Sequence, residues 1–259
     1  MSFLKMRNVL LALIVSTLLA GGAWATPVGD NYIGATDSLN RDVIGNHHEF
    51  DIAGANIQRV GSELLVQINT NFAGLADNML YSNYTTSGNG IGYGDLFLAP
   101  KWTPSGSSPY EGDDHSNGTT WTHGFSLDNR WSDLGGDGAL YKLDPLEKAN
   151  EILLSETFIT GASYRKGQEV AISGNPNSKV STGTWKVSDP GFIQFAIDIS
   201  KADTLLASDY IAFHWTMTCG NDVIEGQVPN SVPEPSSMLL LGLGLIGIAG
   251  LGRSKFRAK

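Results

Sequence analysis

Residues 62–72 read SELLVQINTNF, a stretch in which apolar and polar side chains alternate. Leu64, Val66 and Ile68 fall on one side of an extended chain, and Gln67 falls on the other. A period of two residues is typical of a β-strand that buries one face and leaves the other in water. We therefore predict that this segment is a strand in the wall of an apolar core.

Two further segments show the same alternation. Residues 191–199 place three apolar side chains on one face, namely Ile193, Phe195 and Ile197. Residues 210–219 place five on one face and three polar side chains on the other, namely Ile211, Phe213, Trp215, Met217 and Cys219 against His214, Thr216 and Thr218. Turn-forming residues bound both segments, with DPG at 189–191 and GND at 220–222.

The chain between residues 26 and 229 continues this pattern in shorter pieces. Further strands are predicted at residues 50–57, 93–98, 120–125, 139–143, 151–159, 169–173 and 183–187. Only residues 200–208, SKADTLLAS, indicate a short helix. About ten short strands, 31 glycines and little helix predict an all-β fold, either a single jelly-roll-like β-sandwich domain over residues 26–229 or a partly closed barrel.

The N-terminal residues have the composition of an export signal. Lys5 and Arg7 precede an apolar run, and Ala23 and Ala25 occupy the two small-residue positions that signal peptidase reads. We predict that residues 1–25 are a signal peptide that is cut after Ala25. An uncleaved N-terminal anchor is the alternative, although the apolar run is short for a bilayer span.

The C-terminal residues form a complementary arrangement. Residues 230–237 contain two prolines and predict an exposed, extended linker, because proline fits neither a helix interior nor a sheet ladder. Residues 238–252 follow as an apolar helix, whose 14 uncharged residues from 238 to 251 cover only about 21 Å of a roughly 30 Å hydrocarbon core. The basic tail at residues 253–259 is expected to stay in the cytoplasm, and its cations are Arg253, Lys255, Arg257 and Lys259.

The order of these C-terminal parts resembles a known sorting signal. Val232, Pro233, Glu234 and Pro235 precede a Gly- and Leu-rich helix and a basic tail, as in the PEP-CTERM signal of bacterial exosortase substrates. The resemblance implies a Gram-negative exported protein that is held in the inner membrane by this helix. It also implies that an exosortase processes the chain near the Pro-Glu-Pro before delivery to the cell surface or the surrounding polymer. A plain single-pass anchor with a proline-containing stalk is the alternative.

Three strings inside the predicted domain are also similar to strings of other PEP-CTERM proteins. They are TNFAG at 70–74, GYGDLF at 92–97 and HWTMTCGNDVIEG at 214–226. This likeness favours a single domain of the kind found in such surface proteins, and it names no activity.

Charge and cysteine content restrict the partners and the covalent chemistry. Without residues 1–25 and 232–259, the chain has 11 Lys and Arg against 25 Asp and Glu, a net charge of −14. So acidic a domain argues against nucleic acid or anionic lipid headgroups as partners. Cys219 is the only cysteine, so an internal disulfide is impossible, and its place at the end of an apolar strand predicts a buried thiol.

Residues 81–138 form the least regular stretch, and long loops on a β scaffold often carry binding sites. Four acidic residues there offer oxygen ligands suited to calcium, the one cofactor considered: Asp113, Asp114, Asp133 and Asp137. Four aromatic residues in or near this region offer faces for sugar rings, with anchoring of the loops in the core as the alternative: Trp102, Tyr110, Trp121 and Trp131.

Catalytic signatures are missing from the sequence. The chain contains no Gly-x-Ser-x-Gly motif, and Cys219 has no local catalytic signature around it. We therefore predict a non-enzymatic exported protein that is a structural or adhesive component of the surface polymer or biofilm matrix. Its predicted partners are exosortase and signal peptidase during export and exopolysaccharide afterwards. The alternative is a secreted carbohydrate-binding module or a glycan-active enzyme that uses residues 81–138.

Overall fold

The computed structural model describes residues 25–35, 41–144, 151–161, 164–173, 179–189 and 191–230 of the chain. Residues Ala25–Ser231 form one compact unit. Among the described residues, no helix combines the length and the apolar composition needed to cross a bilayer. Several predicted features lie outside the described residues, namely most of the signal peptide with Ala23, the motif Val232, Pro233, Glu234 and Pro235, the helix at 238–252 and the tail at 253–259.

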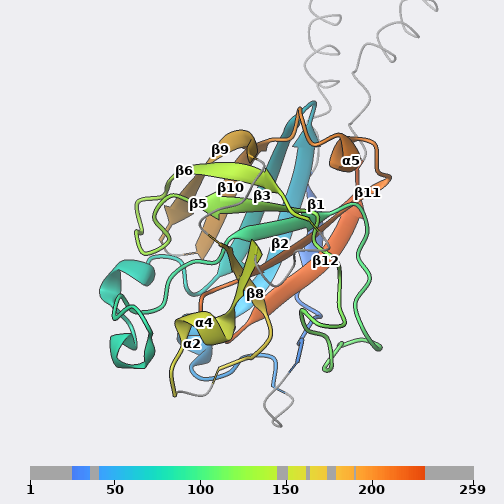
Figure 1. The fold of residues 1–259 in the computed structure, drawn as a ribbon. Helices are drawn as coiled ribbons and strands as arrows, with labels where there is room; N and C mark the ends of the chain where they lie inside the picture. The colour runs from blue at the N-terminus through green and yellow to red at the C-terminus, as the bar shows by residue number, and fades with distance from the viewer. Residues whose placement is uncertain are drawn as a thin grey trace, which may run out of the picture. The chain divides into compact units, whose positions relative to one another are not determined.

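Strands dominate this unit, and ten of them form one antiparallel sheet (Figure 1). Their spatial order is β1-β2-β3-β10-β9-β6-β5-β4-β11-β12. Their bounds are β1 Thr26–Gly29, β2 Ile52–Val60, β3 Glu63–Thr70, β4 Leu96–Ala99, β5 His123–Leu127, β6 Gly136–Lys142, β9 Lys179–Ser188, β10 Gly191–Asp198, β11 Tyr210–Thr216 and β12 Val223–Pro229. The edge strands β1 and β12 contact each other, so the sheet curls into a nearly closed sandwich. The predicted all-β class is confirmed.

Smaller elements pack around this sheet. β7 (Ile152–Leu154) and β8 (Glu169–Ile172) form a separate two-stranded sheet, and β8 contacts β5 and β11 of the large sheet. The helical turns are α2 His47–Phe50, α4 Ser155–Phe158, α5 Asp203–Leu206, η1 Ala76–Asn78 and η2 Ser82–Tyr84.

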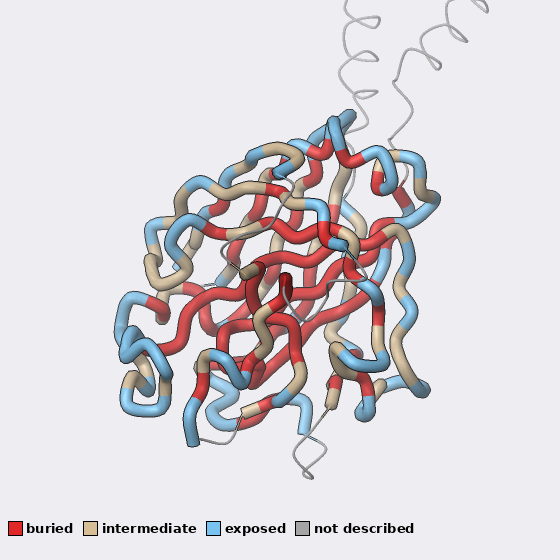
Figure 2. Tube along the Cα trace, viewed as in Figure 1, coloured by how far each residue is buried: buried red, intermediate tan, exposed pale blue. Residues whose placement is uncertain are grey.

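The apolar core lies between the walls of the curled sheet, where Figure 2 shows the buried residues in red. The strands predicted at residues 62–72 and 191–199 are confirmed as β3 and β10, which pair along their full length. Their alternating apolar residues are fully buried, namely Leu64, Val66, Ile68, Ile193, Phe195 and Ile197. Each such side chain contributes about 1.5–3 kcal/mol by leaving water, so the period of two determines which face turns inward.

Strand β11 keeps the predicted alternation, but both of its faces are buried. Phe213 and Trp215 belong to the main core. Ala212 belongs to a second apolar cluster on the outer face, and the His214 ring lies 5.7 Å from the ring of Trp121 in that cluster. The small β7–β8 sheet covers this part of the outer face, which explains why the second face of β11 is also buried.

Two of the shorter predictions need correction. The segment predicted as a strand from residue 50 begins with a helical turn, because the Asn46 side chain accepts a hydrogen bond from the His48 amide at 3.0 Å. The strand β2 therefore begins at Ile52. The segment at 151–159 divides into β7 and α4, while the short helix predicted within 200–208 is present as α5.

Candidate functional site

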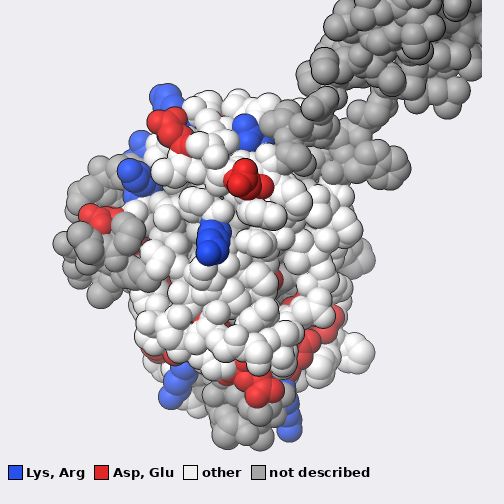
Figure 3. All heavy atoms as spheres, turned by 90° about the vertical axis from the view of Figure 1, so that its right-hand side faces the viewer, with Lys and Arg blue, Asp and Glu red and all other residues white. Residues whose placement is uncertain are grey.

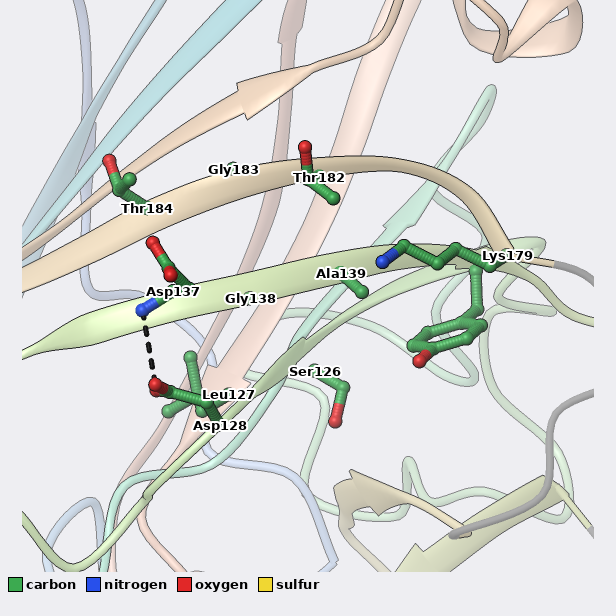
Figure 4. Close-up of a pocket in the computed structure, with 11 residues that line it drawn as sticks. Ser126, Leu127, Asp128, Asp137, Gly138, Ala139, Lys179, Thr182, Gly183 and Thr184 are labelled. Carbon is green, nitrogen blue, oxygen red and sulfur yellow. Dashed lines mark hydrogen bonds between the residues drawn. The ribbon is translucent and has the colours of Figure 1, made fainter.

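A groove of about 540 Å³ lies on the outward face of three neighbouring strands, β5, β6 and β9 (Figure 4). The strands alternate, so residues such as Phe125 and Trp185 point into the core and their neighbours point outward. The outward residues that line the groove are Ser126, Asp137, Ala139, Tyr141, Thr182 and Thr184.

Two glycines keep the strands under this groove close to the core. Gly138 in β6 pairs with Gly183 in β9, and the ring of Phe125 lies beneath both. A Cβ atom at Gly138 would lie 2.3 Å from Phe125 Cζ, and one at Gly183 would lie 2.9 Å from Phe125 Cε2. Both contacts are too short, so only glycine permits the aromatic ring to lie this close to the inner side of the groove floor.

Charged side chains mark the two ends of the groove. Figure 4 shows Asp128 and Asp137 at one end and Lys179 at the other, with Ala139 between them. Both Asp137 and Lys179 are exposed. Residues 137 to 141 of β6 span about 13 Å at about 3.3 Å per residue, so the groove is longer than one sugar ring.

Asp128 is held in place by three N–H donors. Its Oδ1 accepts hydrogen bonds from Trp185 Nε1 at 3.0 Å and from the Asn129 amide at 2.9 Å. Its Oδ2 accepts one from the Asp137 amide at 3.2 Å, the bond drawn in Figure 4. Asp128 is therefore a fixed hydrogen-bond acceptor at the end of the groove.

The four aromatic residues predicted as sugar contacts are engaged in packing or hydrogen bonds within the domain. Trp121 is only 2% exposed, and half-buried Trp102 donates from Nε1 to Glu225 Oε2 at 2.8 Å. Tyr110 packs edge-on against Trp102 with ring centroids 5.1 Å apart. Trp131 donates from Nε1 to the Gly90 carbonyl at 3.3 Å. These contacts tie loops to the sheet, which favours the anchoring alternative.

The four acidic residues predicted as calcium ligands do not form one group, although Asp113 and Asp114 are neighbours in one loop. Asp113 accepts hydrogen bonds from the Tyr32 hydroxyl and the Ser105 amide, whereas Asp133 accepts bonds from the amides of Ala76 and Asp77. Asp114 caps its own loop, and Asp137 lies in the groove. Among the described residues, the groups of three possible metal ligands include none of Asp113, Asp114, Asp133 and Asp137.

One of those groups is a buried polar network under the small sheet. His214 Nε2 lies 2.6 Å from the Glu169 carbonyl oxygen, which can only accept, so Nε2 carries a proton. His214 Nδ1 lies 2.9 Å from Glu225 Oε1. Burial raises the pKa of Glu225 to about 7, although its hydrogen bond with His214 opposes this. The ligand atoms of Glu225 and His214 are thus already used within the protein.

The other group joins three carboxylates with ligand oxygens within 4.8 Å of one another: Asp30, Asp42 and Asp222. Oxygen-only sets are of the type that calcium prefers. Asp222 accepts bonds from the amides of Ile52 at 2.6 Å and Val223 at 2.8 Å, whereas Asp30 Oδ2 is buried without a hydrogen-bond partner.

The guanidinium of Arg165 adjoins this acidic cluster. It is fully buried and donates to five backbone carbonyls, those of Gly34, Ala35, Arg41, Asp42 and Gly220. Its positive charge favours the ionised forms of Asp30 and Asp42, against the effect of burial.

Sequence reasoning missed both the groove and the acidic cluster. The groove depends on the pairing of β6 with β9, which are not consecutive strands, and no local pattern predicts that pairing. The alternation of Thr182 and Thr184 with inward Gly183 was the available signal, but it shows only that these two hydroxyls share a face.

On the face seen in Figure 3, Lys and Arg side chains are scattered among wide uncharged areas, whereas several Asp and Glu side chains gather at the lower right. A nucleic-acid site needs Lys and Arg gathered in a patch or stripe. That face carries none, in keeping with the net negative charge of the domain.

The fold and the groove define an all-β domain with an open, polar sheet surface. Comparison with known families identifies the PEP-CTERM protein-sorting motif at residues 231–254. The chain is therefore an exported protein that an exosortase sorts after transient anchoring at the membrane. No curated protein and no solved structure matches the chain.

Proposed function

We propose that the β domain is a non-enzymatic structural or adhesive component of the cell-surface polymer or biofilm matrix, and that it holds polysaccharide along the groove. The observation that carries this proposal is the groove itself, in which Ser126 of β5, Ala139 of β6 and Thr182 of β9 are in register across three strands. Thr184 lies two residues further along β9, opposite Asp137. The sorting motif supports the same destination, because it directs the chain to the cell surface.

The groove offers the chemistry that a chain of hydroxyl groups requires. Threonine and serine hydroxyls both donate and accept, Asp137 accepts, and Lys179 donates. Tyr141 adds an aromatic ring beside these groups, and a sugar has apolar ring faces as well as polar edges. An extended polymer fits a flat, open groove better than a small metabolite does, since small molecules favour enclosed cavities.

The hydrogen bonds of Asp128 favour binding over hydrolysis. Glycoside hydrolysis needs one protonated carboxylic acid beside a second carboxylate. Both oxygens of Asp128 already accept N–H bonds from the domain itself, so its place in the groove is that of a fixed acceptor. A glycan-active enzyme is therefore the less favoured alternative.

Removal of the groove hydroxyls is expected to weaken binding without unfolding the domain. In the full chain, Thr182→Val and Thr184→Val together with Tyr141→Ala should reduce the affinity for exopolysaccharide from the native host at least tenfold. Valine keeps the β-branched shape and removes only the hydroxyl, so the melting temperature should hold within about 2 °C for the two threonine changes. Affinity is measured by sedimentation with the insoluble polymer.

The matched control is Thr160→Val, an exposed threonine outside the groove. It should bind polymer as the unchanged protein does. Equal binding of polymer by the groove variant and the control would contradict the proposal that the groove binds polysaccharide. Release of reducing sugar from the polymer, abolished by Asp137→Asn, would favour the enzyme instead.

Processing and location give a second test of the surface role. In the native host we expect a mature species that begins at Thr26, ends near Pro233 to Pro235 and lies outside the cell. In a strain without the exosortase gene, that species should be missing from the outside. Intact mass and cell fractionation measure both. A species that keeps Lys259 in the inner membrane of both strains would contradict the proposal and indicate a permanent anchor.

A further inference from the structure

A second pocket of about 200 Å³ lies away from the groove, and none of its lining residues lines the groove. Its floor comes from Phe50, Ile91 and Ile159, which are all buried. Its other wall comes from the turn after β11, where Cys219 and Asn221 lie. The sorting signal and the groove leave this pocket without a role.

Tyrosines surround the pocket. Tyr81, Tyr84 and Tyr164 all line it, and Tyr81 and Tyr84 are 44% and 46% exposed. Exposure of this size is unusual for large aromatic side chains, which otherwise bury most of their surface. The two exposed rings therefore offer faces to a ligand that enters the pocket.

The loop that carries these tyrosines is held in one shape. The Tyr84 carbonyl accepts a hydrogen bond from the Thr160 amide at 2.7 Å, and Thr85 forms a β-bridge with Ile159. Tyr81 has a φ of 55°, in the left-handed region that non-glycine residues seldom occupy. Its hydroxyl donates to Glu49 Oε2 at 3.1 Å. The pocket is thus pre-formed, which lowers the entropic cost of binding.

Asn221 provides the decisive polar group. It is only 6% exposed and lines the pocket, and its side-chain oxygen Oδ1 is buried without a hydrogen-bond partner. Buried amide groups in folded proteins are nearly always paired. An unpaired carboxamide oxygen in an otherwise apolar, aromatic pocket indicates that a ligand supplies the missing donor.

We propose that this pocket binds the acetamido group of an N-acetylated amino sugar in the extracellular polymer. A carboxamide and an acetamide are complementary, since each offers one N–H donor and one carbonyl acceptor to the other. The acetyl methyl group would lie against the apolar floor formed by Phe50 and Ile159, and the sugar ring would stack on Tyr84 or Tyr81.

The size and charge of the pocket fit this substituent. A volume of about 200 Å³ is below the roughly 300–1,000 Å³ of sites that enclose a whole drug-sized ligand, so it suits a substituent with part of one ring. Burial raises the pKa of the Cys219 thiol to about 12, so that group stays neutral. Glu49 is already engaged by Tyr81. The ligand that fits is therefore uncharged, and a sugar with hydroxyls alone would leave the apolar floor unused.

The test uses the purified full chain and three small probes, studied by saturation-transfer difference NMR. The probes are methyl N-acetyl-β-glucosaminide, methyl β-glucoside and N-acetylglycinamide, which has the acetamide without the ring. We expect the strongest saturation at the acetyl methyl group of the first probe, with an affinity at least fivefold above that of the glucoside. The N-acetylglycinamide should bind more weakly than the amino sugar, because it lacks the stacking ring.

Two variants connect this signal with the pocket. Asn221→Ala and Tyr84→Ala should each lower the affinity for the amino sugar at least fivefold. Tyr210→Ala is the control, since Tyr210 is equally exposed at 45% and lies outside the pocket. If Asn221→Ala does not fold, the Tyr84→Ala variant and the comparison of the three probes still test whether the pocket binds the amino sugar.

Equal binding of the amino sugar and the glucoside would overturn the acetamide assignment. Equal binding of N-acetylglycinamide and the amino sugar would overturn the sugar assignment and indicate a peptide amide as the ligand. Loss of the signal in the groove variant, with no loss in Tyr84→Ala, would overturn the pocket as its origin. Because the groove and the pocket share no lining residue, failure of one proposal leaves the other testable.

Discussion

Replacing Arg165 by methionine is expected to lower the stability of the domain by about 3–5 kcal/mol, the usual cost of breaking a buried charge network by removing one partner. For a domain of this size each kcal/mol corresponds to about 2–4 °C, so the melting temperature should fall by roughly 6–20 °C. Thermal unfolding of the full chain, followed by circular dichroism, measures the change.

The reason lies in what the guanidinium holds together. Arg165 donates to carbonyls of two segments that are far apart in the sequence, the loop after β1 and the turn at Gly220. Methionine fills a similar volume but donates no hydrogen bond, so these carbonyls lose their partner in a dry site. The positive charge beside Asp30 and Asp222 disappears as well.

Two controls separate these effects from a general loss of charge. Lys166→Met removes a cation from the adjacent, exposed position and should change the stability by less than about 0.5 kcal/mol. Arg165→Lys keeps the charge but has too few donors for five carbonyls. Its melting temperature should therefore lie between those of the unchanged protein and Arg165→Met. A melting temperature for Arg165→Met within 2 °C of the unchanged protein would contradict the structural role.

The pattern of alternating side chains predicted the strands well, because burial of one face acts locally. The segment SELLVQINTNF gave β3 with its buried face correct, since water is excluded on only one side there. The same reasoning was incomplete for β11, where the β7–β8 sheet covers the second face. A strand covered on both sides loses the contrast between apolar and polar residues on which the prediction depends.

The sites were harder to predict because each combines residues from distant segments. Thr182 and Thr184 reach Ser126 only through the pairing of β6 and β9, and Asn221 reaches Tyr84 only through the packing of two loops. Composition suggested that acidic and aromatic residues between 81 and 138 would carry function. Trp102 and Asp133 instead find partners inside the domain, whereas Asp137 lies in the groove and Tyr81 and Tyr84 line the second pocket.

Replacing Asp30 by asparagine is expected to stabilise the domain at high pH and to have a smaller effect at low pH. Burial, followed by the charges of Asp42 and Asp51, raises the pKa of Asp30 to about 8, against the Tyr32 amide and Arg165. The folded state therefore binds this proton more tightly than the unfolded state, where the pKa is about 3.9. The contribution of this proton to the free energy of unfolding is fully present below about pH 4. It is lost as the pH rises through about 8.

Urea unfolding of both proteins at pH 5, 6.5 and 8 measures this difference, with a chelator present so that protons alone bind the carboxylates. The gain in stability of Asp30→Asn should grow with pH and reach about 1–3 kcal/mol at pH 8, the scale of one unpaired buried polar group. The direction follows from linkage, because asparagine keeps a neutral side chain in the site at every pH.

The control is Asp198→Asn, because this aspartate has a shift of the opposite sign. Hydrogen bonds from the Ser200 amide and hydroxyl lower the pKa of exposed Asp198, so its contribution is lost as the pH falls. The difference between Asp198→Asn and the unchanged protein should therefore be a loss of stability that shrinks toward low pH. A gain for Asp30→Asn that is the same at pH 5 and pH 8 would mean that the pKa of Asp30 is not raised in the folded state. If the gain grows with pH, burial and the charge of Asp42 together raise the pKa of Asp30, and Arg165 only partly offsets them.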